Sequence, residues 1–336
     1  MRAKINHLFV LNPVSFPHKA DMEHFVGIVR KRFAGDEHAF KIHVSAFPRD
    51  AIAHIRSRAE ELREDERLKV YAVGGDGILF DCLNGVIGLP NVELGAIPYG
   101  KTNDFVRAFG DCLNEEFRDV GNQMNGKPVW SDVISVGSFF AMNTCSVGME
   151  AYAVHRAFDL QRRFKPVLEA LPRPVSLFFF NIFYYIGAFC SMNKEILTQS
   201  YTVTMDGKDY SGGYASINIA NGPCYGGDKL GAVAAMPDDG LLDVIFLKNC
   251  GVFTCLTKGL DYVYGNVRKY PDYFSYHRTK EISIRSDKPL VLQLDGEIFV
   301  DTNITAKVCP RAVKIISVNN REFKRRSGFE DIRRGD

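Results

Sequence analysis

The stretch Gly74-Gly75-Asp76-Gly77 places one carboxylate among three glycines, directly after the apolar run LKVYAV and before a helix-like pattern. Glycines let backbone N–H groups approach an anion closely, and the N-terminus of the following helix adds partial positive charge, so this turn suits a phosphate. A carboxylate at such a place needs a cation, which predicts magnesium on a nucleotide beside Asp76. The alternative is that Asp76 only caps the helix, and the turn alone does not decide between the two.

Two further polar turns follow other apolar runs. Residues 100–104, with the sequence GKTND, open the segment after VELGAIPY, where helix capping is their simplest role. Asn12 closes the first apolar run of the chain. In parallel sheets, ligands bind beyond the carboxyl ends of the strands, so the three turns together favour one phosphate cleft.

The elements that must position these turns alternate in type. Up to about residue 130, short apolar runs alternate with amphipathic segments, which is typical of a mostly parallel sheet with helices on both faces. After about residue 130, strand-like runs dominate, including SYTVTMDG, GGYASINIAN, LLDVIFL and AVKIISV. We therefore expect an α/β domain followed by a mainly antiparallel β domain, in a chain long enough for two domains.

Composition excludes some classes of function. Lys and Arg number 42 against 40 Asp and Glu, a formal charge of +2, which gives no support to a nucleic-acid binder. The eight cysteines form no CxxC pair, so a structural zinc site is not expected. The N-terminus has too short an apolar run for a secretory signal, so we expect reduced thiols and a cytoplasmic protein.

The segment 175–190, VSLFFFNIFYYIGAFC, is almost entirely apolar and strongly aromatic. Its sixteen residues fall short of the roughly 20 that a spanning helix needs, so we expect a buried or surface-docked helix. The aromatic density leaves contact with a lipid surface open, and the basic tail after residue 320 would suit the same surface. A core helix and a solvated tail are the alternatives.

In order along the chain, seven blocks resemble the bacterial diacylglycerol kinase family of lipid kinases. These blocks are NP at 12–13, GGDG at 74–77, NG at 84–85, PYGKTNDFVRAFG at 98–110, MNTCSVGMEA at 142–151, PDDGLLDV at 237–244 and LDGE at 294–297. The resemblance covers nearly the whole chain. It implies a Rossmann-like α/β nucleotide-binding domain over residues 1–130, rejoined by about 320–336, a β-sandwich-like lipid-substrate domain over 131–319, and an active site in the cleft between them.

The resemblance also implies site residues. Those that would bind the phosphates of ATP are Asn12, Gly74, Gly75, Asp76, Gly77, Lys101, Thr102 and Asn103. Asp76 would also hold catalytic Mg²⁺, whereas Asp239 and Asp243 would lie at a second magnesium site linked through water to Asp104 and Asp132. The general base would be Glu297, with Asp295 as second choice. The alternatives are a β-turn whose aspartates cap their own backbone and an ordinary DG hairpin.

The chain departs from the family pattern at several positions. Ile78 stands where the family has a threonine after GGDG, and Asp81 stands where it has a glutamate. Lys101 replaces the threonine of PxGTxND, and Phe16 replaces the glycine of NPxSG. Two phosphate-binding hydroxyls are therefore missing, which Lys101 as a cation and Thr102 as a displaced hydroxyl would replace.

The sequence favours an ATP-dependent, magnesium-requiring lipid kinase that phosphorylates diacylglycerol or a related lipid at a membrane surface, for example to phosphatidic acid. A NAD kinase is the second choice, because it shares a GGDG turn. A nucleotide- or lipid-sensing protein without turnover is the non-catalytic alternative. A homodimer is left open by the sequence.

Overall fold

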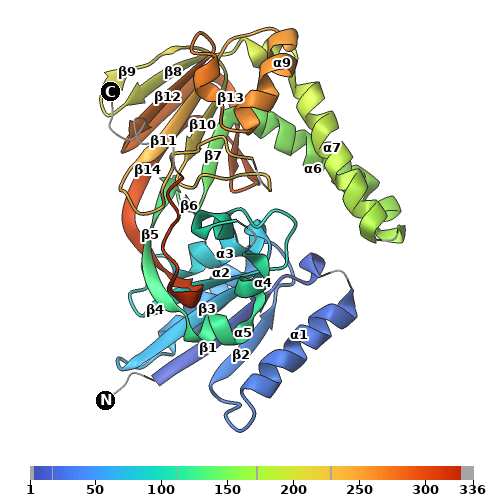
Figure 1. The fold of residues 1–336 in the computed structure, drawn as a ribbon, viewed down its shortest axis with the longest axis vertical. Coiled ribbons are helices and arrows are strands. Elements are labelled where there is room, and N and C mark those ends of the chain that lie inside the picture. Colours follow the sequence, from blue (N-terminus) through green and yellow to red (C-terminus); the bar gives the residue numbers. More distant parts are fainter. Residues whose placement is uncertain (1–3, 17, 112, 172, 228, 327–336) are drawn as a thin grey trace.

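The computed structural model describes residues 4–16, 18–111, 113–171, 173–227 and 229–326. The N-terminal part forms a parallel sheet covered by helices, and the later part forms a β-rich domain above it (Figure 1). The elements of the first domain are β1 (Lys4–Leu11), η1 (Pro13–Ser15), α1 (Lys19–Arg32), β2 (Phe40–Val44), α2 (Asp50–Glu60), β3 (Glu66–Gly74), α3 (Asp76–Val86), β4 (Val92–Pro98), η2 (Phe105–Phe109), α4 (Asn114–Arg118) and α5 (Val120–Asn125), where η marks a 3-10 helix.

The alternation of side chains along β1 explains why helices cover both faces of this sheet. Leu8 and Val10 point into one core with α2 and α3. Phe9 and Leu11 point into the other core, against α1. Successive strand residues face opposite sides, so a strand that is apolar throughout must be covered twice. The strands β2, β1, β3 and β4 are parallel neighbours, as the sequence predicted.

The segment after the second glycine turn forms only the short helix η2 instead of a regular α-helix. Asn103 before it has a φ of 51°, and Gly110 after it has a φ of 138°. Both values lie outside the α-helical region, so the chain cannot continue as a helix on either side.

The second domain is built mainly from antiparallel strands. Its elements are β5 (Lys127–Val136), β6 (Phe139–Ala141), β7 (Thr144–Gly148), α6 (Met149–Ala170), α7 (Arg173–Ser191), α8 (Lys194–Leu197), β8 (Ser200–Met205), β9 (Lys208–Asp209), β10 (Gly212–Ala220), β11 (Leu242–Lys248), α9 (Val252–Val263), η3 (Val267–Lys269), β12 (Phe274–Thr279), β13 (Glu281–Leu294), β14 (Glu297–Ser317) and η4 (Val318–Asn320). The strands β12, β11, β10, β7, β13 and β14 lie side by side in that order. The runs EISIRS and LVLQL both belong to the single strand β13.

The strand β14 belongs to both domains. Its first half pairs with β13 of the second domain, and Ile315 near its end pairs with Leu94 on β4 of the first domain. The strand β5 runs antiparallel to the second half of β14. One continuous sheet therefore connects the two domains, as Figure 1 shows for β5 and β14.

The aromatic segment forms α7, which packs along α6 as an antiparallel pair that projects from the body of the molecule (Figure 1). The expected helix is therefore present. Among the residues that the structure describes, no helix has both the length and the apolar content to cross a bilayer.

The chain returns to the first domain after η4. Phe323 packs against Phe109, with ring centroids 4.6 Å apart, and Lys324 N donates to Ala108 O at 2.7 Å. Arg321 forms an ion pair with Glu116 at 2.7 Å. Most of the basic tail, residues 327–336, lies outside the described residues.

Candidate active site

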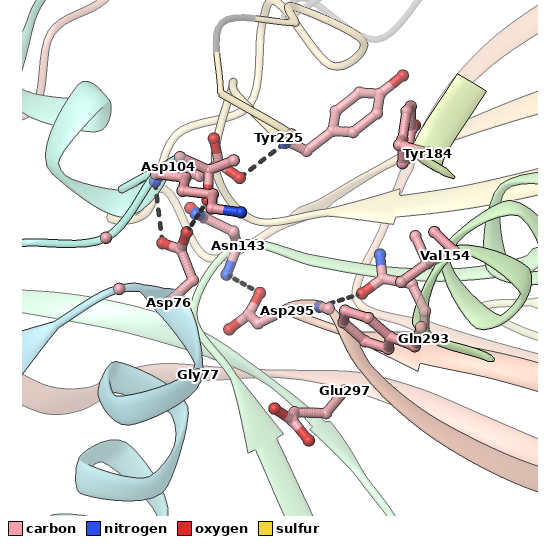
Figure 2. A pocket seen from close by; sticks show the side chains of 18 of the residues that line it. Asp76, Gly77, Asp104, Asn143, Val154, Tyr184, Tyr225, Gln293, Asp295 and Glu297 are labelled. Atoms are coloured by element: carbon pink, nitrogen blue, oxygen red, sulfur yellow. Dashed lines mark hydrogen bonds between the residues drawn. The ribbon is translucent and has the colours of Figure 1, made fainter. Parts of the chain in front are cut away.

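A cavity of about 440 Å³ lies between the two domains, beyond the carboxyl ends of the parallel strands. The first domain contributes turns, the second contributes the β13–β14 hairpin, and α6 and α7 form a further wall (Figure 2). The lining residues from the predicted site are Asn12, Gly75, Asp76, Gly77, Lys101, Thr102, Asp104, Asp295 and Glu297. The structure thus brings most of the expected nucleotide and catalytic residues to one cavity.

The two glycine turns touch each other through their backbones. A Cβ atom added to Gly100 would lie 2.2 Å from the Cα of Gly75, a distance that no side chain tolerates. Backbone hydrogen bonds from Tyr99 N and Gly100 N to Gly74 O, at 2.8 and 3.0 Å, hold the turns together. The close approach therefore requires glycine at position 100.

Asp76 is not the cap of α3. Gly75 occupies the N-cap position, and Asp76 is the first helical residue. The Asp76 carboxylate instead accepts hydrogen bonds from the second turn, from Asp104 N at 2.9 Å and from the hydroxyl of Thr102. The displaced hydroxyl of Thr102 therefore contacts the carboxylate.

Asp104 lies next to Asp76 and joins the two domains (Figure 2). Its carboxylate accepts hydrogen bonds from Gly226 N and Gly227 N of the second domain, both at 2.7 Å. Burial, and then the nearby charge of Asp76, raise the pKa of Asp104 to about 8. Burial also raises the pKa of Asp76. A divalent cation beside this pair would offset both effects, so the two carboxylates fit Mg²⁺.

The DG hairpin between β13 and β14 presents the two candidate bases. Asp295 and Gly296 have φ values of 46° and 90°, as a two-residue turn with positive φ at both positions requires. The Asp295 carboxylate accepts three backbone hydrogen bonds, from Met142 N at 2.5 Å and from Asn143 N and Thr144 N at 2.9 Å. Burial nevertheless raises the pKa of Asp295 to about 6. These bonds attach the hairpin to the neighbouring strand.

Glu297 lies on the other side of the turn and close to the first glycine turn. A Cβ atom added to Gly77 would lie 3.4 Å from Glu297 Oε1. Burial raises the pKa of Glu297, and the charge of Arg49 opposes this increase. In the absence of three backbone donors such as those on Asp295, Glu297 is better placed to accept a proton.

Arg49 is a site residue that the sequence analysis missed. It precedes α2 in the left-handed conformation, with a φ of 73°. Its backbone N–H and guanidinium both donate to Asp81, at 2.9 and 2.5 Å, and the guanidinium also lies 3.1 Å from Glu297 Oε2. Asp81 was noted as a departure from the family pattern, but no local sequence signal paired it with Arg49.

The other predicted residues divide into two groups. Lys101 and Asn12 line the cavity, and the Asn12 side chain also accepts a hydrogen bond from Val14 N at 3.2 Å. Asn103 is buried and donates to Gly100 O at 3.0 Å, which shapes the turn. Ile78, at the family's threonine position, is buried in the core of the first domain.

The aspartates expected at the second magnesium site contact protein groups in the structure. Asp132 accepts backbone hydrogen bonds from Gly240 and Arg311, both at 2.7 Å. Asp239 and Asp243 both lie against the guanidinium of Arg278. Over the described part of the chain, no three His, Cys, Asp or Glu side chains form a group that could hold a metal ion.

Comparisons with known proteins agree with this architecture. Residues 6–136 match the diacylglycerol kinase catalytic domain, and residues 174–317 match the YegS C-terminal NAD kinase beta sandwich-like domain. A protein named "putative lipid kinase" from Staphylococcus epidermidis is 24% identical over 313 residues, which cover 88% of this chain and 92% of that protein. Another of the same description from Staphylococcus haemolyticus is 27% identical over 266 residues, covering 74% and 76% of the two chains.

A crystal structure described as a diacylglycerol kinase from Bacillus anthracis shares the fold, with a TM-score of 0.67 and 18% identity over 95% of this chain and 98% of that one. The fold and the cavity define a two-domain, lipid-kinase-like enzyme with an α/β catalytic domain and a β-rich partner domain. The chain belongs to the bacterial diacylglycerol kinase family. Membership implies a nucleotide as phosphate donor and usually a divalent metal.

Proposed function

We propose that this protein is an ATP-dependent, Mg²⁺-requiring kinase that phosphorylates a hydroxyl group of diacylglycerol or a related lipid. One observation carries the proposal: Glu297 lies against Gly77 of the glycine turn, in the cavity that Asp76 also lines. Phosphoryl transfer needs positioned phosphates, a cation and a carboxylate near the acceptor hydroxyl, and little covalent help from the protein.

The first domain binds the phosphates in this proposal. Gly75, Asp76 and Gly77 line the cavity at the N-terminus of α3, and a helix N-terminus favours an anion. Lys101 adds a positive charge on the opposite turn. Asp76 and Asp104 would hold Mg²⁺, which when bound neutralises charge on the transferred phosphoryl group.

The hairpin of the second domain provides the base. Glu297 accepts the proton of the acceptor hydroxyl, and the raised pKa that burial gives it favours this transfer. Asp295 acts indirectly, because its three backbone hydrogen bonds keep the hairpin in register with the strand that carries Thr144. Asp295 is therefore a positioning residue.

The acceptor would enter along α6 and α7. Val154, Ala157 and Phe158 on α6 form an apolar wall of the cavity, with Tyr184 from α7 beside them. Side chains on the outer faces of these helices are exposed and apolar, among them Tyr185 and Phe189 at 68% and 65% exposure. Arg162, Arg163 and Lys165 on α6 are exposed as well. Apolar and cationic groups together suit the surface of an anionic membrane, so we also propose reversible peripheral membrane contact.

An assay with γ-labelled ATP, run separately on mixed lipid vesicles and on NAD, tests the proposed reaction. We expect labelled phospholipid only with vesicles and only in the presence of Mg²⁺. Labelled NADP without labelled lipid would instead identify a NAD kinase. Binding of ATP without either product would identify a sensor that has lost turnover.

A further inference from the structure

Arg278 occupies the place between the two aspartates at which the family resemblance implies a second magnesium ion. Arg278 on β12 is the register partner of Asp243 on β11. Its Nη2 donates a hydrogen bond to Oδ2 of Asp239, and its Nε lies 3.6 Å from Oδ1 of Asp243. The three side chains are 12%, 18% and 0% exposed, respectively, so this contact is shielded from solvent.

Two further contacts of these aspartates come from neighbouring residues. The hydroxyl of Tyr276 donates to Asp243 Oδ1 at 2.8 Å. Leu241 N donates to Asp239 Oδ1 at 3.3 Å. Asp239 thus combines a neutral donor with a hydrogen bond from the guanidinium, and Asp243 combines a neutral donor with the nearby positive charge.

We propose that the guanidinium of Arg278 supplies the positive charge that the two aspartates of the loop 237–243 require. Asp239 and Asp243 therefore bind no divalent metal in this protein. A completely buried carboxylate such as Asp243 needs a compensating positive charge, and a planar guanidinium can serve two carboxylates at once. Magnesium would need several oxygen ligands at about 2.1 Å in near-octahedral geometry. It would also be repelled by the guanidinium next to it.

The Arg278 guanidinium supports the candidate active site indirectly, through the loop 237–243. Asp132 fixes the same loop from the other side, since Asp132 N donates to Pro237 O at 2.6 Å and its carboxylate accepts from Gly240 N. The loop follows the buried segment 231–237, which comes after Gly226 and Gly227, the donors to Asp104, along the chain. Arg278 is therefore a structural group, and its role does not depend on the reaction proposed above.

Counting bound Mn²⁺ by electron paramagnetic resonance, with no nucleotide present, tests this proposal. Mn²⁺ is the probe for wild type, Asp239→Asn, Arg278→Met and the double variant. We expect Asp239→Asn to bind as many ions as wild type with unchanged affinity. Arg278→Met should bind one ion more, because two carboxylates lose their cation, and the double variant should lose that ion again.

Thermal unfolding of the same variants gives a second, independent measurement. The Tm of Arg278→Met should fall, and Mn²⁺ should restore part of the loss, whereas Arg285→Met, at an exposed position on β13, should behave as wild type. If Arg278→Met does not fold, Arg278→Lys takes its place in both measurements. The Mn²⁺ counts of wild type and Asp239→Asn test the proposal in either case. A Mn²⁺ site that wild type has and Asp239→Asn lacks would overturn the proposal, as would an Arg278→Met variant with the Tm of the Arg285→Met control.

Discussion

The guanidinium of Arg49 in the first domain lies 3.1 Å from the carboxylate of Glu297 in the second. The same guanidinium pairs with Asp81 at 2.5 Å and lies 4.5 Å from the centre of the Phe80 ring. Contacts with Asp81 and Phe80 on α3 thus hold the Arg49 guanidinium in place. The same guanidinium contacts the candidate base across the domain boundary. Its positive charge favours the ionised form of Glu297, against the effect of burial.

Replacing Arg49 should therefore change the pH dependence of turnover. In Arg49→Met the pKa of Glu297 rises further, so the ascending limb of the kcat/KM profile should move to higher pH. Arg49→Lys should give an intermediate profile, because it keeps a charge without the planar fork. Arg58→Met, within α2 and paired with Glu61, is the control. A profile in Arg49→Met that coincides with wild type would show that Arg49 does not set the pKa of the base.

Substitutions of the two hairpin carboxylates should have different effects on turnover and stability. Glu297→Gln should lower kcat by about 100- to 10,000-fold with little effect on ATP binding or Tm, since the amide keeps the shape but accepts no proton. Asp295→Asn turns an amide NH₂ toward backbone N–H donors, which should cost about 1–3 kcal/mol of unfolding free energy. Kinetics and denaturant unfolding of both variants measure this contrast. An inactive but stable Asp295→Asn beside a nearly normal Glu297→Gln would move the base to Asp295.

Asp76→Asn should separate a metal role from a structural one. Asparagine can still accept the hydrogen bond from Asp104 N, and it removes a charge next to Asp104, so unfolding free energy should not fall. Turnover should drop by about 100-fold or more, and the Mg²⁺ concentration for half-maximal activity should rise. Titration of activity with Mg²⁺ checks this, and full activity at the wild-type Mg²⁺ requirement would remove Asp76 from the metal site.

The contact between the two glycine turns predicts a strong effect of a single methyl group. In Gly100→Ala the new Cβ would meet the Cα of Gly75, so the turns must separate. We expect at least about tenfold weaker ATP binding and a loss of about 1–3 kcal/mol in stability. Gly27→Ala, within α1, is the control, because nothing lies within 4 Å of the Cβ atom that it adds. Isothermal titration should show normal ATP affinity for that control; normal affinity in Gly100→Ala would contradict the role of this contact.

If α7 contacts the membrane, replacing Phe189 should weaken binding to vesicles. Replacing a similarly exposed residue elsewhere should not. Phe189→Ser removes an aromatic side chain that is 65% exposed, and cosedimentation with anionic vesicles should weaken by about tenfold. Val300→Ser, at 63% exposure on β14, should bind vesicles as wild type does. Equal losses in both variants, or equal recovery of wild type in the supernatant with and without vesicles, would exclude this surface.

Local patterns in the sequence were sufficient for much of the fold. The apolar run around Phe9 predicted one strand and the apolar run before Gly74 predicted another, because each depends on adjacent residues. For the same reason, Asp295-Gly296 was open to interpretation as a hairpin turn. The length of β14 was not predictable in this way, since its two halves pair with different domains.

Contacts between distant residues explain what the sequence could not show in the candidate site. Arg49 and Glu297 are 248 positions apart, and only the folded chain brings them together. The same holds for Arg278, which lies 39 positions from Asp239. Side chains of this kind carry no motif of their own, because an arginine in a strand or before a helix has many unrelated uses.

The continuity of β5 and β14 through both domains restricts how the cavity can open. A flexible linker would allow one domain to rotate freely, whereas here two hydrogen-bonded strands must bend or twist together. Their pairing is interrupted between Cys309 and Val313, where Arg311 adopts a φ of 49°. Bulges of this kind change strand direction locally, so this is where bending breaks the fewest hydrogen bonds. Relative motion of the domains should consequently be small and directed along one axis, and larger access for a bulky substrate must come from α6 and α7 instead of from domain separation.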